Sequence, residues 1–398
     1  MTDADALPTP PPARKRSEQR RWTVLLPVVG LIALACSGLV LFALGTSTTG
    51  LLPILVGVLA ALLPVGPVIM AYLWVDRWEP EPAKILLLAF AWGALGATIC
   101  SLAFNSRAQA IGDLIRQGFG ADFAAVIGAP VAEEAAKAAF LVVLFLRRRN
   151  EFDGVVDGIV YAGVTAAGFA FTENIWYFAR VFNEGGFGTA SSGIVGLFIL
   201  RGVLAPFAHP LFTSLTGIGI GIAALSGSKA VRIVAPLVGY LCAAGLHSLW
   251  NFSTTVGDGT TFINLYFLIM VPIFVGMVVL VVWQRRREQR IVAGQLPEMA
   301  ANRWIAASEV ALLASLPGRK NWRRAVRAKV GDKAADAVRG YQHAVTELAF
   351  LRHRIAQGTA GHDADDRHQL LLSTLLAARQ AAVAAPGAMK AAGRQRQG

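Results

Sequence analysis

Ionisable and amide side chains interrupt four consecutive apolar stretches of the sequence. A charged side chain inside a bilayer costs at least about 2.5 kcal/mol, so it normally faces a polar cavity or a partner and marks a functional site. Apolar stretches elsewhere in the chain carry almost no such residues. The candidate functional residues in these four stretches are Glu133, Glu134, Lys137, Glu173, Asn174, Arg201, His209, His247 and Asn251.

Helical spacing indicates which of these side chains share a face. Glu133 and Lys137 are four residues apart, as are His247 and Asn251, so each pair lies on one side of a helix. Glu133 and Glu134 are about 100° apart around the helix axis, so one can face a cavity while the other supports it.

The acids and the imidazoles are expected at a similar depth in the membrane. At about 1.5 Å per residue, Glu133, Glu173 and His247 each lie on the order of 10–16 Å from the outer end of their helix. His209 has the same depth if Arg201 marks the outer interface. We therefore expect these groups to converge in the outer half of the bilayer.

Two carboxylates and two imidazoles can hydrolyse a carbonyl compound in two ways. In the first, a Glu takes a proton from water while His or Asn side chains stabilise the oxyanion. In the second, two His and one Glu hold a catalytic zinc ion with an open coordination position. The predicted catalytic residues are Glu133, Glu134, His209 and His247, and both schemes favour hydrolysis of a peptide bond.

The composition is that of a membrane protein. Of the 398 residues, 55% are hydrophobic and 16% charged, against about 25% charged in soluble proteins. Because a span needs roughly 20 apolar residues, we predict an all-α polytopic membrane bundle of about eight spans. Their expected ranges are 22–44, 51–75, 84–105, 122–146, 155–182, 198–225, 231–253 and 262–283. Its three cysteines lie inside these runs without metal-ligand spacing.

Charge divides the chain into three parts and sets the expected orientation. Residues 1–21 are predicted to be a disordered basic segment, 22–284 the membrane domain with the active site, and 285–398 a basic helical tail with 20 Lys and Arg against 9 Asp and Glu. Lys and Arg cluster at alternate loops, which places both termini in the cytoplasm of a multi-pass cell-membrane protein. Anionic inner-leaflet lipid can attract the tail, and a nucleic-acid partner is not expected.

The tail is predicted to contain one long helix with an apolar stripe from Trp322 to Leu351. Spacings of three, four and seven to eight residues support that helix. Gly358 is expected to stop it, and a shorter helix is expected over roughly 367–385.

The four motifs together resemble the PrsW-type intramembrane proteases, a group related to the CAAX prenyl endopeptidases and bacteriocin-processing enzymes. The motifs are Glu133-Glu134-Ala-Ala-Lys137, Phe169-Ala-Phe171-Thr-Glu173-Asn174, Arg201 with His209-Pro-Leu-Phe212, and His247-Ser-Leu-Trp250-Asn251. The resemblance covers roughly residues 60–283 and implies a multi-span metalloprotease that cleaves membrane-anchored anti-sigma factors outside the cytoplasm.

The resemblance also implies roles for the residues around the predicted catalytic four. Lys137, Glu173, Asn174, Arg201 and Asn251 would support them, and His209, His247 and Glu173 would be the ligands if a metal such as Zn²⁺ is present. In the prenyl-protease branch a glutamate-activated water without a metal is favoured, so a metal-free mechanism stays open.

Two other classes of function remain open. The buried Glu and His residues could form the relay of a proton-coupled transporter, although transporters more often have two related halves. They could also belong to a catalytically inactive membrane scaffold, in which Glu133 pairs with Lys137, and Glu173 with Lys137 or Arg201.

Overall fold

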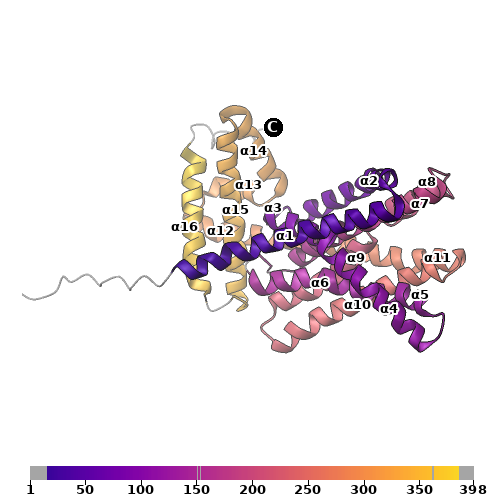
Figure 1. Cartoon of the computed structure of the whole chain (residues 1–398). Helices are drawn as coiled ribbons and strands as arrows, with labels where there is room; N and C mark the ends of the chain where they lie inside the picture. Colours follow the sequence, from indigo (N-terminus) through magenta and orange to yellow (C-terminus); the bar gives the residue numbers. More distant parts are fainter. Residues whose placement is uncertain (1–15, 150, 153, 361–362, 385–398) are drawn as a thin grey trace, which may run out of the picture.

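The computed structural model describes residues 16–149, 151–152, 154–360 and 363–384. Throughout these ranges the regular structure is helical, with no strand. A bundle of long helices forms the larger part, and a smaller helical unit covers one of its ends (Figure 1). The predicted all-α polytopic bundle is confirmed.

The bundle contains all the segments predicted to cross the membrane. Several of them contain a short π-helical turn, labelled η. In chain order the elements are α1 (Arg16–Thr49), α2 (Leu51–Val75), α3 (Ala83–Ala91), η1 (Trp92–Ala97), α4 (Thr98–Ile115), α5 (Gly120–Phe123), η2 (Ala124–Gly128), α6 (Ala129–Arg147), α7 (Val155–Gly185), α8 (Gly193–Phe198), η3 (Ile199–Leu204), α9 (Ala208–Leu225), α10 (Lys229–Thr255), α11 (Gly259–Leu265), η4 (Tyr266–Met270) and α12 (Val271–Ala301).

Seven helical segments in the described chain are long and apolar enough to span a membrane, one fewer than the sequence predicted. The expected span at 122–146, which corresponds to α5, η2 and α6, is absent from that set. Glu133, Glu134, Lys137 and Arg147 all lie in the 19 residues of α6, so its composition is less apolar. In the bundle α6 nonetheless packs against α4, α7, α9 and α10, and its three inner charges are buried.

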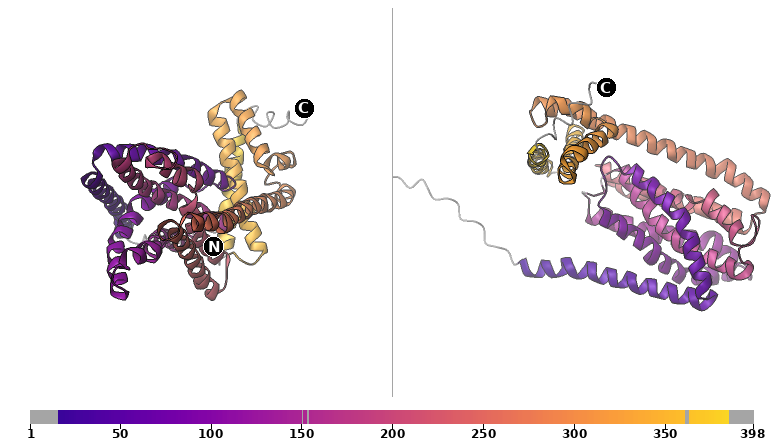
Figure 2. Two further views of the ribbon diagram at one scale, coloured as in Figure 1. Left: turned by 90° about the vertical axis from the view of Figure 1, so that its right-hand side faces the viewer. Right: turned by 90° about the horizontal axis from the view of Figure 1, so that it is seen from above.

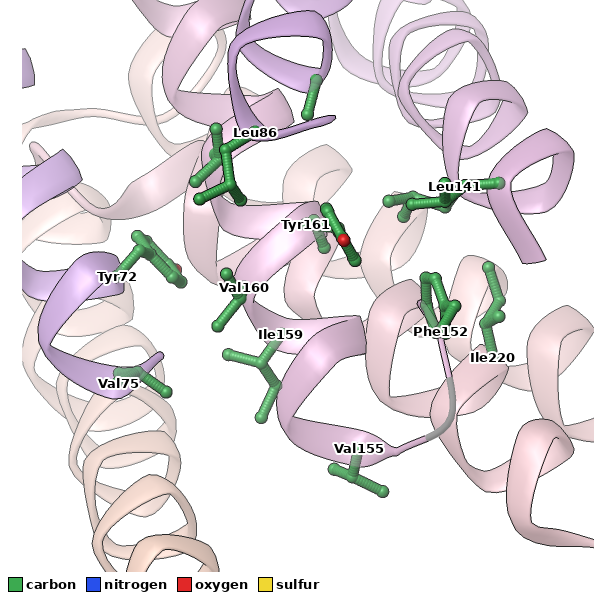
Figure 3. Close-up of a cluster of buried hydrophobic side chains, with 14 of the residues drawn as sticks. Tyr72, Val75, Leu86, Leu141, Phe152, Val155, Ile159, Val160, Tyr161 and Ile220 are labelled. Carbon is green, nitrogen blue, oxygen red and sulfur yellow. The ribbon is translucent and has the colours of Figure 1, made fainter. Parts of the chain in front are cut away.

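Helix α7 is the centre of the bundle. In its most apolar window 72% of the residues are buried, against at most 39% in the other spans. Helices α2 and α9 pack along it, with Ile159, Val160 and Tyr161 in the shared core (Figure 3). A Cβ atom on Gly158 would lie 2.1 Å from the carbonyl oxygen of Gly217, so only glycine permits this close approach of α7 and α9.

The smaller helical unit consists of the end of α12, the short helices η5 (Ala307–Glu309) and α13 (Val310–Leu313), and then α14 (Leu316–Val330), α15 (Asp332–Ala356) and α16 (Ala364–Ala384). Helix α12 runs the length of the bundle and continues into this unit (Figure 2). Trp78, from the loop after α2, belongs to the same apolar core as Leu296, Trp322 and Tyr341, so the unit is packed onto the bundle.

The prediction of one long tail helix was wrong. Gly331, with φ of 103°, separates α14 from α15. Glycine adopts this left-handed backbone without steric cost and so ends helices there. Trp322 before the turn and Val338 and Leu348 after it still enter one core, because the two helices pack against each other. Gly358, with φ of 67°, follows the end of α15 as predicted.

The N-terminal segment predicted to be disordered lies mostly outside the described residues. Residues 1–15 are not among them, whereas α1 already begins at Arg16, so residues 16–21 are helical.

Candidate active site

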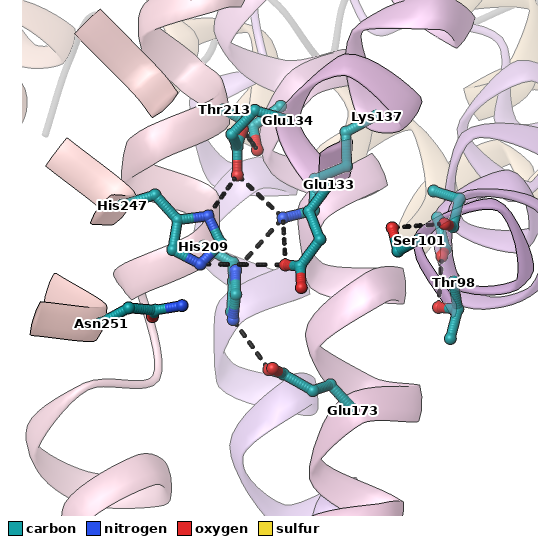
Figure 4. A network of polar contacts seen from close by, with 12 residues as sticks. Thr98, Ser101, Glu133, Glu134, Lys137, Glu173, His209, Thr213, His247 and Asn251 are labelled. Atoms are coloured by element: carbon teal, nitrogen blue, oxygen red, sulfur yellow. Dashed lines mark hydrogen bonds and ion pairs between the residues drawn. The ribbon is translucent and has the colours of Figure 1, made fainter. Parts of the chain in front are cut away.

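Four helices of the bundle bring the predicted site residues into one buried network (Figure 4). Helix α6 supplies Glu133, Glu134 and Lys137, while Glu173 comes from α7. Helix α9 supplies His209, and helix α10 supplies His247. The hydrogen bonds and ion pairs between them join residues up to 113 positions apart in sequence. The predicted convergence of these side chains is therefore present, and their depth in the outer half of the bilayer stays a prediction.

A helix break places His209 at the start of α9. The π-helical turn η3 ends at Leu204 and α9 begins at Ala208. Pro210 then lies in the first turn of α9. Backbone N–H groups in a first turn have no acceptor within the helix, so proline costs no helical hydrogen bond there. His209 is therefore held in the first turn of α9, and its side chain is 8% exposed.

Glu134 is a fully paired carboxylate. It is completely buried and accepts hydrogen bonds from Lys137 Nζ at 2.8 Å, Thr213 Oγ1 at 2.7 Å and His247 Nδ1 at 3.1 Å. A carboxylate can only accept, so Nδ1 of His247 carries the proton and Nε2 carries the lone pair. Glu134 thus orients the His247 ring and fixes its tautomer.

Glu133 differs from Glu134 because its buried oxygen Oε2 accepts no hydrogen bond. Its Oε2 atom is buried without a hydrogen-bond partner, 3.8 Å from His247 Nε2 and 3.7 Å from Lys137 Nζ. Oε2 and Nε2 are both acceptors, and they face each other across a distance that a direct hydrogen bond does not close. A water molecule or a cation between them would satisfy both.

His209 is held at both ring nitrogens. Nε2 donates to Glu173 Oε2 at 2.8 Å, and Nδ1 accepts from Lys137 Nζ at 3.2 Å. Arg201 pairs with Glu173 and also donates from Nε to Asn174 Oδ1 at 2.6 Å. The Glu173 carboxylate is therefore fixed between Arg201 and His209, and it orients the His209 ring.

Asn251 contacts the backbone instead of the acids and imidazoles. Its Nδ2 atom donates to the carbonyl oxygen of Ala125 at 2.8 Å, in the π-helical turn η2. Such turns leave main-chain groups without their usual helical partners and often lie at functional sites. Asn251 thus ties α10 to the segment that leads into α6.

Sequence reasoning missed several residues that build the site. Thr213, a donor to Glu134, is four residues after His209, so the helical spacing used for the other pairs could have found it. The Phe169 ring lies 3.9 Å from Lys137 Nζ, and the Phe212 ring stacks on His247 with centroids 5.0 Å apart. Trp92 in η1 donates from Nε1 to the carbonyl of Ala136 in α6 at 2.9 Å, a contact that no local spacing signals.

The donor set fits a metal ion. Glu133, His209 and His247 can each offer one ligand atom, and these atoms lie within 4.8 Å of one another. Two imidazoles and a carboxylate are the ligands of several catalytic zinc sites. Glu133 Oε2 and His247 Nε2 are free to bind, whereas His209 first has to release Lys137 or Glu173. The sequence-based ligand set named Glu173 as the third ligand; the group that meets here contains Glu133 in its place.

An apolar cavity of about 300 Å³ is lined by residues close to the two histidines in sequence, although neither histidine lines it. Its lining includes Phe212 and Trp250, together with Leu204, Tyr266 and Met270 from η3 and η4. The Phe212 ring is also in contact distance of both imidazoles, with centroids 5.0 Å from His247 and 6.0 Å from His209. One aromatic ring therefore separates the polar network from a pocket suited to apolar side chains.

Comparisons with known proteins identify one family. The sequence profile of the PrsW family of intramembrane metalloproteases matches residues 81–277, which contain all nine predicted site residues. Proteins named Protease PrsW from Geobacillus kaustophilus, Clostridioides difficile and Bacillus subtilis are 29%, 27% and 24% identical over 165, 199 and 213 residues.

Those alignments cover parts of both partners. They span 41%, 48% and 53% of this chain and 65%, 77% and 89% of the three relatives, so the first relative is matched over slightly less than two thirds of its length. The C-terminal unit after α12 lies outside the family match. No solved structure matches the chain with significance.

Proposed function

We propose that this chain is a member of the PrsW family of intramembrane metalloproteases, whose profile matches residues 81–277, and that it hydrolyses a peptide bond of a membrane protein within the bilayer. One observation carries the proposal at the level of residues. Glu133 Oε2 is a buried acceptor without a hydrogen-bond partner, and it faces His247 Nε2 at 3.8 Å. That pair is the place for the water molecule that the reaction consumes.

In the proposed reaction Glu133 is the general base, His247 Nε2 accepts a hydrogen bond from the attacking water, and His209 is the oxyanion donor. The water oxygen attacks the carbonyl carbon while its proton passes to Glu133. The proton then moves to the amide nitrogen as the C–N bond breaks, which yields a carboxyl and an amino terminus. The N–H group of His209 Nε2, once released from Glu173, would donate to the developing negative charge on the carbonyl oxygen. Glu134, Glu173, Asn174, Arg201 and Lys137 position these groups.

Glu133, His209 and His247 are the residues that would hold a divalent metal such as Zn²⁺, for the reasons given by the donor set. When bound, such an ion polarises the carbonyl group and lowers the pKa of water. Glu134 keeps its place in either case, because its bond to His247 Nδ1 directs Nε2 toward Glu133. A metal-free, glutamate-activated water is the alternative mechanism.

The substrate we propose is a single-span protein, with membrane-anchored anti-sigma factors as the first candidates. The apolar cavity beside Phe212 and Trp250 would take side chains of such a transmembrane segment, since it is lined mainly by hydrophobic residues. The orientation we propose has both termini in the cytoplasm, because Lys and Arg gather at the loops on that side.

The test is a substrate-trapping comparison in cells that produce the full chain. Glu133→Gln should leave one or more membrane proteins uncleaved that wild type cleaves, as read by mass spectrometry of new N-termini in the membrane fraction. Glu184→Gln is the matched control, because Glu184 is an exposed acid that pairs with Arg180 far from the network. Unchanged cleavage by Glu133→Gln at equal abundance refutes the proposal. Loss of a proton flux in proteoliposomes with proteolysis intact would favour the transporter instead.

A further inference from the structure

A second cavity lies at the junction of the bundle and the C-terminal unit. Its volume is about 360 Å³, and it is bounded by the ends of α6, α9 and α10 and by the turn between α15 and α16. Phe145, in its wall, is twelve residues after Glu133 along α6, about 18 Å along the helix. The cavity is thus separate from the candidate active site.

The walls of this junction cavity are of two kinds. On the bundle side they are apolar, with Phe152 and Ala223 fully buried and Leu225 at the end of α9. On the other side they are basic. The charged residues that line the cavity are Arg149, Arg232, Arg354, Arg367 and one acid, Asp363.

These charges favour an anion with phosphate-like geometry. Four guanidinium groups face one carboxylate, which leaves an excess of three positive charges. The planar guanidinium binds phosphate oxygens through two parallel hydrogen bonds, better than an ammonium group does. Two of the four are also oriented by the protein: Arg232 Nε donates to the carbonyl of Ser226 at 2.8 Å, and the Arg149 guanidinium lies 5.3 Å from the centre of the Phe145 ring.

The apolar wall distinguishes a lipid from a small soluble anion. The cavity is lined by residues at the ends of α6, α9 and α10, beside the C-terminal unit. At such a level a phospholipid presents its phosphate beside the first carbons of its acyl chains. Basic pockets between membrane helices are known to bind anionic head groups. A free phosphate ion would use the arginines and leave the apolar wall without a partner.

We propose that the junction cavity binds the phosphate of an anionic phospholipid, which bridges the membrane bundle and the C-terminal helical unit. Arg149 and Arg232 contribute from the bundle, and Arg354 and Arg367 contribute from the C-terminal unit. The lipid therefore contacts both parts of the chain at once. Arg354 and Arg367 lie outside the family match, and the inference does not depend on the proposed peptidase activity.

The test uses the full chain in nanodiscs that contain phosphatidylglycerol and phosphatidylcholine in equal amounts, with native mass spectrometry of the lipid that stays bound. Wild type should retain phosphatidylglycerol preferentially. Arg232→Gln combined with Arg367→Gln should lower that preference by about thirtyfold, since each charge near an anionic lipid is worth about fivefold in affinity. Arg232→Lys with Arg367→Lys should recover part of it, which separates lost charge from misfolding.

The matched control is Arg290→Gln combined with Arg324→Gln, which removes the same charge from two exposed arginines that do not line the cavity. Equal lipid retention in the cavity variant and this control overturns the proposal. A further arm adds inorganic phosphate at millimolar concentration. Displacement of phosphatidylglycerol by phosphate alone would identify a soluble anion as the ligand and overturn the lipid assignment; retention of the lipid supports it.

Discussion

Replacing each of the two adjacent acids of α6 by glutamine should separate a positioning role from a catalytic one. Glu134 accepts from Lys137, Thr213 and His247 and is completely buried. Glu133 has an oxygen with no hydrogen-bond partner. The same chemical change therefore removes three charge-assisted hydrogen bonds at one position and few interactions at the next.

The expected magnitudes follow from those contacts. A hydrogen bond to a charged group contributes about 1.5–3 kcal/mol, and removing one partner of a buried ion pair costs about 3–5 kcal/mol. The amide oxygen of Glu134→Gln can still accept from Lys137 and His247, and its NH₂ group can donate to Thr213 Oγ1, but Lys137 loses the negative charge that pairs with it. We expect Glu134→Gln to lower the free energy of unfolding by about 3–5 kcal/mol, and Glu133→Gln by less than about 1 kcal/mol.

The assay is unfolding of the detergent-purified full chain in an SDS titration, followed by far-ultraviolet circular dichroism, together with cleavage in cells. Glu133→Gln should unfold like wild type and yet abolish cleavage. Glu134→Gln should impair both, and Glu184→Gln, at an exposed ion pair, should impair neither. The reasoning is refuted if Glu133→Gln destabilises the protein as much as Glu134→Gln does, or if Glu134→Gln leaves its stability unchanged.

Two further predictions concern the metal and the pH dependence of stability. Removing divalent metal with a chelator should abolish cleavage, and adding Zn²⁺ should restore it. His247→Ala should lower the amount of bound metal measured by mass spectrometry. Full cleavage by metal-depleted protein would contradict this prediction and favour the metal-free mechanism. Burial raises the pKa of Asp76, just after α2, to about 7, although both of its carboxylate oxygens accept from the backbone N–H of Glu81. The folded state therefore keeps a proton that the unfolded state releases near pH 4, so the Asp76 contribution to stability is full below pH 4 and is lost as the pH rises through 7. Between pH 4 and 8 the free energy of unfolding should fall less steeply in Asp76→Asn than in wild type. Equal slopes in the two proteins would show that Asp76 does not titrate in this way.

The sequence predicted which residues form the site better than it predicted the hydrogen bonds between them. Acids, imidazoles and amides within apolar runs are visible without coordinates, because each is costly in a membrane. Which atom bonds which is not visible, since it depends on the rotation of four helices about their axes. Hence Asn251, expected beside the catalytic groups, binds the backbone of Ala125, and Trp92, forty-four residues before Ala136, holds α6 in place.

For the fold, too, the hydrophobic pattern predicted the helices but not how they turn and pack. Apolar runs located the helices of the bundle, and the stripe from Trp322 to Leu351 correctly identified a buried face. Periodicity does not distinguish one long helix from two packed helices that bury the same stripe, so the turn at Gly331 was missed. The charges of α6 had a similar effect: they make its composition less apolar than that of a span, although its neighbours bury them.

The balance of charge at the centre explains why one acid is left available. Glu133, Glu134 and Glu173 bring three negative charges, and Lys137 and Arg201 bring two positive charges when the imidazoles are neutral. Lys137 is closer to Glu134 than to Glu133, at 2.8 Å against 3.7 Å, and Arg201 is committed to Glu173. The uncompensated negative charge therefore falls on Glu133, next to the lone pair of His247. A buried negative charge whose counter-ion is shared and more distant is unfavourable, so this position attracts a cation or the hydrogens of a polarised water. The supporting residues thus direct the chemistry to Glu133 by pairing every other acid.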